Sequence, residues 1–441
     1  MPRVDDDGRA ALHGDAATTP REASTTFPDA PRTREGRAAE RVPDPSRAAR
    51  QAQMRTHNLS MTLAQVVDST APPSRAQIAA ATGLARGTVT GLVDLLIEAG
   101  LVRELDPVVV ARAGRPAVPL EVVRGRVAGV GMEVNVDYLG LRAVDLAGGV
   151  VAEAVEAADL RGSDPDVVLD RLAALAAPVL AGLATDGVRV AGTALALPGL
   201  VDRVTGPLRY APNLGWRDVD VVARLAAHPG LAALPPRVAN EANLAARAEA
   251  HARRGEVPPS FLYVSGEVGV GGALVLDGEI FLGRHGWSGE IGHVVVDGGP
   301  AGTRPVSLEQ HAGQDAIAQA AGLVTGAPFA EVAEAVAAGD ARARDAVHAA
   351  ARWLGLALAT VANVVDVSEV VLGGTFGLVY DEVRDVVADT LADRVIFAPW
   401  SAPVVSRSAA GDYPAMTGGA LAVLRTVVAD PTPWFASTTP V

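Results

Sequence analysis

The chain of 441 residues contains no cysteine and no lysine. The absence of cysteine excludes disulfides and thiolate-bound metals and fits a reducing compartment, so we expect a cytoplasmic protein. All 38 basic residues are therefore arginine, which we interpret as a bias of GC-rich coding sequence rather than as chemistry. No apolar run approaches the roughly 20 residues of a membrane-spanning helix, and the charged, proline-containing N-terminus lacks the apolar stretch of a secretory signal. We expect neither a membrane partner nor secretion.

The negative charge is confined to one region of the chain. Residues 1–50 carry nine arginines and nine acidic residues, and residues 51–122 carry six of each, so the whole net charge of −13 lies in 123–441. The length predicts two or three domains. The acidic C-terminal region should repel DNA, which leaves the neutral segment before it free to bind DNA.

Residues 1–50 mix Asp, Arg, Pro, Thr and Ala with almost no large apolar side chain. Such a segment buries too little surface to offset its ordering entropy, so we predict a disordered tail. Its arginine-rich end could act as a DNA-attracted arm, but a solvated tail is the favoured interpretation.

Residues 51–122 have the pattern of a winged helix-turn-helix. Apolar residues recur at helical spacing after Asn58, Ser74 and Gln77 form a capping-box start, Gly83 breaks that helix, and a third helix is expected over 85–99 with Gly100 at its end. Residues 101–103 and 108–110 suggest a two-stranded wing closing on Gly-Arg-Pro at 114–116. The alternative is a small helical bundle with no DNA partner. The pattern favours DNA binding, with these candidate contacts: Arg75, Arg86, Thr88, Thr90, Arg112 and Arg115.

Strands and helices alternate from Arg124 onward, which predicts an α/β domain over 123–441. Three strands open it as a meander at 127–132, 138–144 and 150–154. An amphipathic helix at 166–183 and a buried strand at 188–197 follow. Further strands are expected at 261–264, 271–276 and 369–372, the last preceded by a long helix at 341–365.

Several short motifs together resemble the ROK family of repressors, open reading frames and sugar kinases. They are Arg-Ala-Gln-Ile-Ala at 75–79, Gly-Arg-Pro at 114–116, Ala-Leu-Pro-Gly-Leu-Val-Asp at 196–202, Ala-Pro-Asn-Leu-Gly-Trp at 211–216, Asn-Glu-Ala-Asn at 240–243, Gly-Glu-Ile-Gly-His at 289–293 and Val-Leu-Gly-Gly at 371–374. The resemblance covers about residues 55–430. It implies a two-lobed, actin-like sugar-kinase fold behind the winged helix-turn-helix, with ligands bound in the cleft.

The resemblance also implies the sugar-binding residues. The family's hydroxyl-binding groups fall on Asn240, Glu241, Glu290, His293 and Glu309, and Asn213 is a further candidate. A polyol would supply the hydrogen-bond partners that buried carboxylates and an imidazole need. The alternative is a relic site whose polar groups satisfy one another.

The phosphate-handling features of the family's kinases are altered in this sequence. The Asp-x-Gly-Gly-Thr loop corresponds to residues 133–137, where both glycines are lost and Asp137 replaces Thr, and Gly-Thr-Gly corresponds to 267–269, where Glu267 is the first residue. Added carboxylates repel a triphosphate. The catalytic Asp becomes Glu241, and the three zinc-binding cysteines fall on Pro300, Gly302 and Ser307. A site made by His293, His311 and Glu309 is the remaining, disfavoured option for a metal.

We therefore predict a sugar-responsive transcriptional regulator, a repressor rather than an activator, with no catalytic activity, cofactor or metal. It would bind operator DNA as a homodimer or homotetramer and sense a sugar or sugar derivative through its degenerate kinase domain. One alternative is an active ATP-dependent sugar kinase with an accessory DNA-binding domain. Another is a regulator that answers to a protein partner.

Overall fold

The computed structural model describes residues 45–107, 117–203, 206–255, 260–299 and 304–435. The chain divides into two compact units, 1–49 and 50–441. Of the first unit only the start of helix α1 (Pro45–Val67) is described, so the predicted disordered tail lies largely outside the described residues. The helix begins well before Asn58, where the apolar spacing starts, and its residues 49–55 are exposed, so apolar periodicity did not mark its first turns.

Helices α2 (Arg75–Thr82) and α3 (Arg86–Glu98) meet at an angle of 118° across a three-residue turn. The predicted capping box is confirmed, because Ser74 and Gln77 bond each other's backbone at the start of α2. Gly83 ends α2 in the left-handed conformation (φ 72°), where glycine carries no steric penalty. This is the geometry of a helix-turn-helix. The three helices share one core with Leu59, Ile78 and Val89 at 0% exposure.

The wing contains one described strand pair that was not predicted. Strand β1 (Val102–Glu104) pairs antiparallel with β2 (Leu120–Val122), while the predicted partner at 108–110 lies outside the described residues. Leu120 and Val122 are buried on the helical core, and this burial fixes the register of β2. Residues 108–116, including Arg112 and Arg115, lie outside the described residues.

The first large sheet has the order β10-β6-β3-β4-β5. The predicted antiparallel meander is present as β3 (Val127–Val134), β4 (Tyr138–Asp145) and β5 (Val150–Ala157), and β6 (Arg189–Leu197) and β10 (Arg237–Asn240) add in parallel. Helix α4 (Pro165–Thr185) packs on one face and α14 (Pro414–Ala429) on the other. This lobe also contains β7 (Leu200–Val201), β8 (Leu208–Ala211), β9 (Trp216–Val219), α5 (Val221–Ala226) and α6 (Pro229–Ala232).

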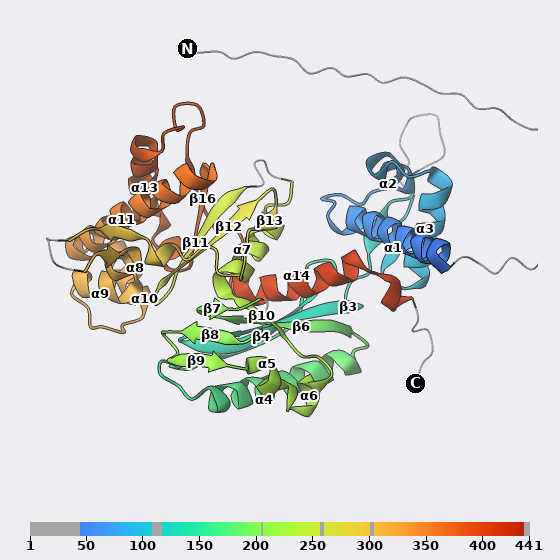
Figure 1. Ribbon diagram of the computed structural model, residues 1–441, viewed down its shortest axis with the longest axis horizontal. Helices are drawn as coiled ribbons and strands as arrows, with labels where there is room; N and C mark the ends of the chain where they lie inside the picture. Colours follow the sequence, from blue (N-terminus) through green and yellow to red (C-terminus); the bar gives the residue numbers. More distant parts are fainter. Residues whose placement is uncertain (1–44, 108–116, 204–205, 256–259, 300–303, 436–441) are drawn as a thin grey trace, which may run out of the picture. The chain divides into compact units, whose positions relative to one another are not determined.

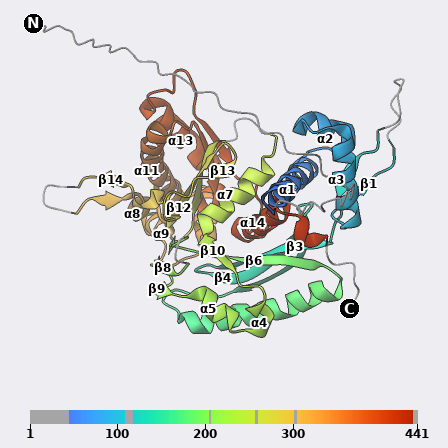
Figure 2. The same ribbon diagram turned by 45° about the vertical axis from the view of Figure 1, so that its right-hand side comes forward.

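The second large sheet has the order β13-β12-β11-β16-β17. Its strands are β11 (Phe261–Gly266), β12 (Val270–Leu276), β13 (Glu279–Ile280), β16 (Glu369–Gly373) and β17 (Val404–Arg407). Helix α7 (Glu241–Ala252) packs against β11 and β12 and lies beside α14, as both views show (Figures 1 and 2). The remaining elements are η1 (Ile291–His293), β14 (Val295–Asp297), β15 (Val306–Ser307), α8 (Leu308–Ala312), α9 (Gln314–Ala321), α10 (Phe329–Ala337), α11 (Ala341–Val365), α12 (Gly374–Leu378), α13 (Tyr380–Arg394) and η2 (Thr432–Trp434).

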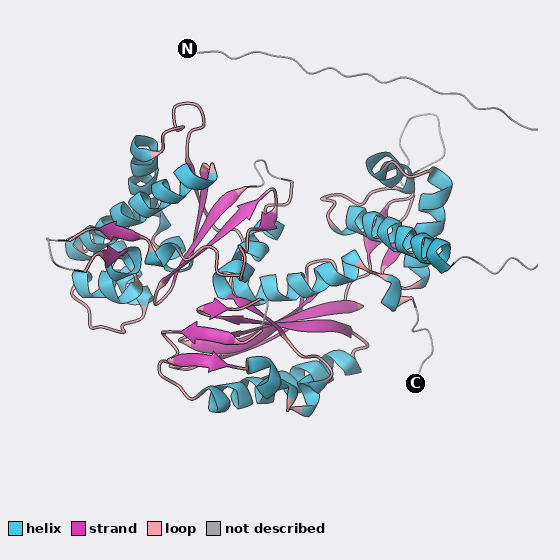
Figure 3. Ribbon diagram, in the orientation of Figure 1, coloured by secondary structure: helices cyan, strands magenta, loops and turns pink. Residues whose placement is uncertain are grey.

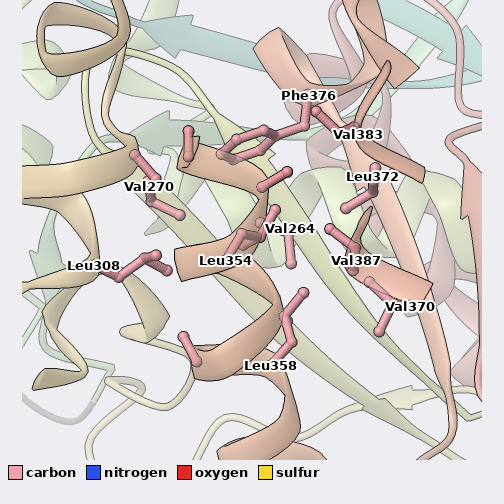
Figure 4. Packing of buried hydrophobic residues seen from close by; sticks show 14 of the residues in the cluster. Val264, Val270, Leu308, Leu354, Leu358, Val370, Leu372, Phe376, Val383 and Val387 are labelled. Atoms are coloured by element: carbon pink, nitrogen blue, oxygen red, sulfur yellow. The ribbon is translucent and has the colours of Figure 1, made fainter. Parts of the chain in front are cut away.

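The largest core cluster lies on the second sheet. Leu354 and Leu358 of α11 pack against Leu372 of β16 and Val387 of α13, and Phe376 closes one end (Figure 4). Within the described residues, α4 and α11 are long and apolar enough to cross a membrane by length and composition alone. In the fold their apolar faces cover the two sheets, so packing accounts for that composition (Figure 3).

The winged-helix core continues into the body of the second unit. Leu59 and Ile78 belong to the same buried cluster as Val144, Leu421 and Leu424, which come from β4 and α14. The boundary predicted at 122/123 separates segments of sequence, but the apolar core runs across it.

Candidate functional site

A cleft between the two sheets contains a cavity of about 180 Å³. One wall comes from the ends of β6 and β8 and the start of α7. The other comes from the β11–β12 turn, η1 and α8. The structure brings all six predicted sugar-binding residues to this cavity: Asn213, Asn240, Glu241, Glu290, His293 and Glu309.

The two glycines of the Gly-Glu-Ile-Gly-His segment seat it on strand β12. A Cβ on Gly289 (φ 99°) would lie 2.3 Å from the carbonyl oxygen of Gly272, and a Cβ on Gly292 would lie 2.3 Å from that of Val270. Only glycine allows this approach. Ile291 between them is 2% exposed and anchors the segment in the core. Glu290 and His293 therefore line the cavity.

Asn240 and Glu241 stand at the start of α7. The Asn240 side chain is its N-cap and accepts hydrogen bonds from the amides of Ala242 (2.9 Å) and Asn243 (3.3 Å), while its Nδ2 donates to the carbonyl of Gly199 at 3.2 Å. Asn240 thus fixes the helix start and the turn after β6 as well as lining the cavity. The Oε2 of Glu241 is buried without a protein hydrogen-bond partner among the described residues, and a hydroxyl in the cavity could satisfy it.

Glu309 and Asn213 approach the cavity from opposite walls at Gly269. A Cβ on Gly269 would lie 2.3 Å from Glu309 Oε2 and 3.7 Å from Asn213 Nδ2, so a side chain there would displace the Glu309 carboxyl group and contact Asn213. Glu309 also accepts a 3.4 Å hydrogen bond from the amide of Val270. The small residue at 269 is needed to keep this part of the cavity open.

The carboxyl groups of the cleft are crowded. The pKa of Glu290 is raised, chiefly by desolvation against the cleft wall, with Glu309 adding to the shift and His293 opposing it. The pKa of Glu241 lies well above its ordinary value of 4.5, first because of burial and then because of Glu267. Burial therefore disfavours the ionised form of both carboxyl groups, and hydrogen bonds from the hydroxyls of a polyol would offset that cost.

The two segments that correspond to the kinase phosphate loops contact each other across the cleft. The Nδ2 of Asn135 donates to Glu267 Oε2 at 2.7 Å and to Glu133 Oε1 at 3.2 Å. Glu133 and Asn135 are 1% and 2% exposed, while Glu267 is half-buried and lines the cavity. Burial raises the pKa of both Glu133 and Glu267, and the charge of Glu267 raises that of Glu133 further. The carboxylates and the asparagine occupy the place where phosphate-cradling glycines are expected.

No group of three or more His, Asp or Glu side chains within the described residues is arranged to hold a metal ion. His311 stacks on Trp353 with ring centroids 4.4 Å apart and does not line the cavity with His293. Of the three positions of the family's cysteines, Pro300 and Gly302 lie outside the described residues. Ser307 forms a capping box with Gln310 at the start of α8.

The described DNA-binding candidates fall into two groups. Arg86, Thr88 and Thr90 are exposed on the first turns of α3, although the Thr90 hydroxyl donates to the carbonyl of Arg86 at 2.9 Å. Arg75 instead forms ion pairs with Asp94 of α3, at 2.8 Å, and with Glu104 of β1. Its guanidinium ties α2 to the recognition helix and the wing.

Sequence reasoning missed two features of the cleft. Tyr210 of β8 lines the cavity, is 39% exposed and carries the guanidinium of Arg217 at 4.4 Å from its ring centroid. An aromatic face in a polar cavity can pack against the C–H face of a sugar ring. The second feature is the contact between Asn135 and Glu267. The position of Tyr210 three residues before Asn213 was the available signal for the first.

Two α/β lobes around a central cleft define the class of actin-like sugar kinases and their relatives. A glucokinase from Streptomyces griseus, solved with glucose and AMPPNP, superposes with a TM-score of 0.55 at 24% identity, covering 67% of this chain and 98% of that one. A ROK family transcriptional regulator, a homolog of the E. coli MLC protein, superposes with a TM-score of 0.69 at 25% identity over 86% of this chain and 97% of that one. The ROK family model matches residues 168–426, and the chain belongs to the ROK family.

One curated relative is a repressor. The xylose repressor of Bacillus subtilis (strain 168) is 28% identical over 228 residues, which make up 51% of this chain and 57% of that protein. The chain thus spans about half the length of this relative. Both regulators and a kinase share the fold, so the assignment between them depends on the residues of the cleft.

Proposed function

We propose that the chain is a sugar-responsive transcriptional regulator, acting as a repressor, whose kinase-like domain binds a sugar without transferring phosphate. The observation that supports it most is the difference between the two parts of the cleft. Its hydroxyl-binding side chains converge on one cavity, while Asn135, Glu133 and Glu267 fill the phosphate-loop positions with a buried, acidic network. Kinases need backbone amides and cations at the corresponding place.

The regulator reads DNA through its N-terminal domain and works in the cytoplasm, where that DNA lies. The exposed start of α3 enters the major groove of an operator, and Arg86 and Thr88 contact base edges. Two such domains on a homodimer or homotetramer match a palindromic operator. Sugar binding changes the closure of the lobes and with it the affinity for DNA. The repressor and regulator relatives support this assignment.

A thermal-shift screen with neutral sugars tests the sensor half, because a ligand that binds the native state stabilises it. Sugars that raise the melting temperature should also release a DNA fragment that carries the operator. Operator binding that no tested sugar changes would defeat this half of the proposal. Operator release that stays unchanged in Glu290→Ala would favour a regulator that answers to a protein partner.

The enzyme alternative has one observation in its favour. Glu241 stands at the position of the family's catalytic aspartate. It has a buried oxygen in the cavity and a raised pKa, as suits a general base. An ATPase assay with hexoses and amino sugars decides between the two. Our proposal predicts no sugar-dependent turnover. Turnover that falls in Glu241→Gln would establish a kinase.

A further inference from the structure

A second hollow lies against the C-terminal half of α7, whose N-terminus borders the sugar cavity. It contains about 90 Å³ and opens between the end of α1, helix α7, helix α14 and the β12–β13 hairpin. Its apolar walls are Val67, Leu146, Ile280, Leu421 and Leu424. None of these residues lines the cleft cavity, so the two hollows are separate.

Four basic side chains converge on this hollow. Arg247 and His251 lie four residues apart on one face of α7, Arg254 follows just beyond the end of that helix, and Arg425 faces them from α14. The acidic groups at the hollow number two. Asp68 accepts from Arg425 at 3.3 Å, and Glu279 lies 3.6 Å from the same guanidinium. With His251 neutral, three positive charges face two negative ones.

Burial and mutual repulsion destabilise the charged forms of the basic groups. The pKa of His251 is lowered to about 4, first by burial and then by repulsion from Arg254 and Arg425. The pKa of Arg247 is lowered as well, chiefly by burial, with Glu279 opposing and Arg425 adding to the effect. One N–H of Arg254 donates a hydrogen bond to the carbonyl oxygen of Val67 at 3.3 Å. An anion would relieve the excess positive charge.

We propose that this hollow binds a small carboxylate with an apolar body, held by Arg247 and Arg425 at its charged end and by the apolar walls at the other. Because the hollow is open on one side, it needs to hold only part of the ligand, whose small ring or short branched chain lies against the apolar walls. A nucleotide or a phospholipid headgroup is polar throughout and would leave the apolar walls unmatched.

The position of the hollow makes its ligand an effector of the DNA-binding domain. Val67 and Asp68 are the last residue of α1 and the one after it, and α1 shares its core with α2 and α3. Helix α7 begins at the sugar cavity, where Asn240 caps it, and carries the basic face of the hollow along its side. Occupancy of the hollow therefore acts on the start of the winged-helix domain directly.

The test uses the full chain and benzoate as the probe, with benzamide as its neutral isostere and phenyl phosphate as a different anion. Titration calorimetry should show saturable binding of benzoate to one site per chain. Benzamide should bind the wild type at least about tenfold more weakly than benzoate does. Arg247→Gln should likewise bind benzoate at least about tenfold more weakly than the wild type, as expected for loss of a charge-assisted contact. Arg352→Gln, on the exposed face of α11, is the matched control and should bind as the wild type does.

Three results would overturn the proposal. They are the absence of saturable benzoate binding, equal binding of benzamide, and binding of phenyl phosphate in place of benzoate. If Arg247→Gln fails to fold, the imidazole resonances of His251 in the wild type serve instead. They should shift on addition of benzoate, and unchanged resonances place the probe elsewhere. Benzoate binding that is lost in Glu290→Ala would likewise place it in the cleft.

Discussion

The carboxamide of Asn135 donates a 2.7 Å hydrogen bond to the carboxylate of Glu267, 132 positions further along the chain and on the other sheet. The same amide also donates to Glu133 at 3.2 Å. A single neutral side chain thereby holds two buried carboxyl groups, one from each lobe, at the place where the family's kinases handle phosphate. The lobes are tied together there without a nucleotide.

The buried carboxyl pair predicts a pH dependence of stability. Glu133 and Glu267 have raised pKa values in the folded protein, so the native state holds more protons than the unfolded state above the ordinary glutamate value of 4.5. Their contribution to the free energy of unfolding is full below that pH and is lost as the pH rises through the raised values. Glu267→Gln should flatten this fall in urea unfolding series. Glu331→Gln, exposed on α10, should not. Equal slopes of the free energy of unfolding against pH for the wild type and the two variants would contradict the assignment.

The close packing of the Gly-Glu-Ile-Gly-His segment on strand β12 predicts a large loss of stability when Gly289 is replaced. Gly339 is a matched control, since it also has positive φ (85°) but has nothing within 4 Å of an added Cβ. Gly339→Ala should cost about 1–2 kcal/mol, the conformational penalty alone. Gly289→Ala should cost more, because its Cβ meets the backbone of Gly272, and should remove the sugar-induced thermal shift. Equal costs would mean that the close approach is not needed.

The sugar cavity predicts a separation between ligand binding and DNA binding. Glu290→Gln keeps the size of the side chain but removes its charge, so we expect sugar affinity to fall by about tenfold or more. Operator affinity without sugar should stay within about twofold, because Glu290 lies in the cleft and not in the winged-helix core. Calorimetry and a gel-shift assay measure the two. Unchanged sugar affinity would remove Glu290 from the binding site.

Two arginines of the winged-helix domain should respond differently to substitution. Arg86 is exposed at the start of α3, so Arg86→Ala should weaken operator binding by about 1–3 kcal/mol at an unchanged melting temperature. Arg75 is paired with Asp94 and Glu104, so Arg75→Ala should lower the free energy of unfolding by about 1 kcal/mol. Fluorescence anisotropy on a selected DNA duplex and thermal melts distinguish them. A reversed pattern would assign the base contact to Arg75.

Local signals in the sequence were sufficient for most elements. The capping box at Ser74 and the long helix at 341–365 could be placed because short-range hydrogen bonding and apolar spacing decide them. The six residues of the sugar cavity came from the motifs of the family. Their convergence could not be derived from spacing, since Asn213 and Glu309 are far apart in the chain and meet only through Gly269.

Long-range pairings could not be read from the sequence. The partner of β1 lies beyond a segment with an equally apolar pattern at 108–110, and the choice of β2 is made by burial on the helical core. Glu133 and Glu267 were each recognised as unusual, but their contact through Asn135 needs the lobes in place. The basic hollow beside α7 has walls from four separate segments, so no local pattern marks it.

Helix α14 has a consequence for how the protein is made. Its residues Leu421, Leu424 and Val428 complete the apolar core that Leu59 and Ile78 begin, more than 300 positions earlier in the sequence. During synthesis on the ribosome the DNA-binding helices emerge first, yet part of their buried surface waits for one of the last helices to be translated. A nascent or truncated chain carries that surface uncovered. Only a chain translated through α14 can complete the apolar core on which these helices pack.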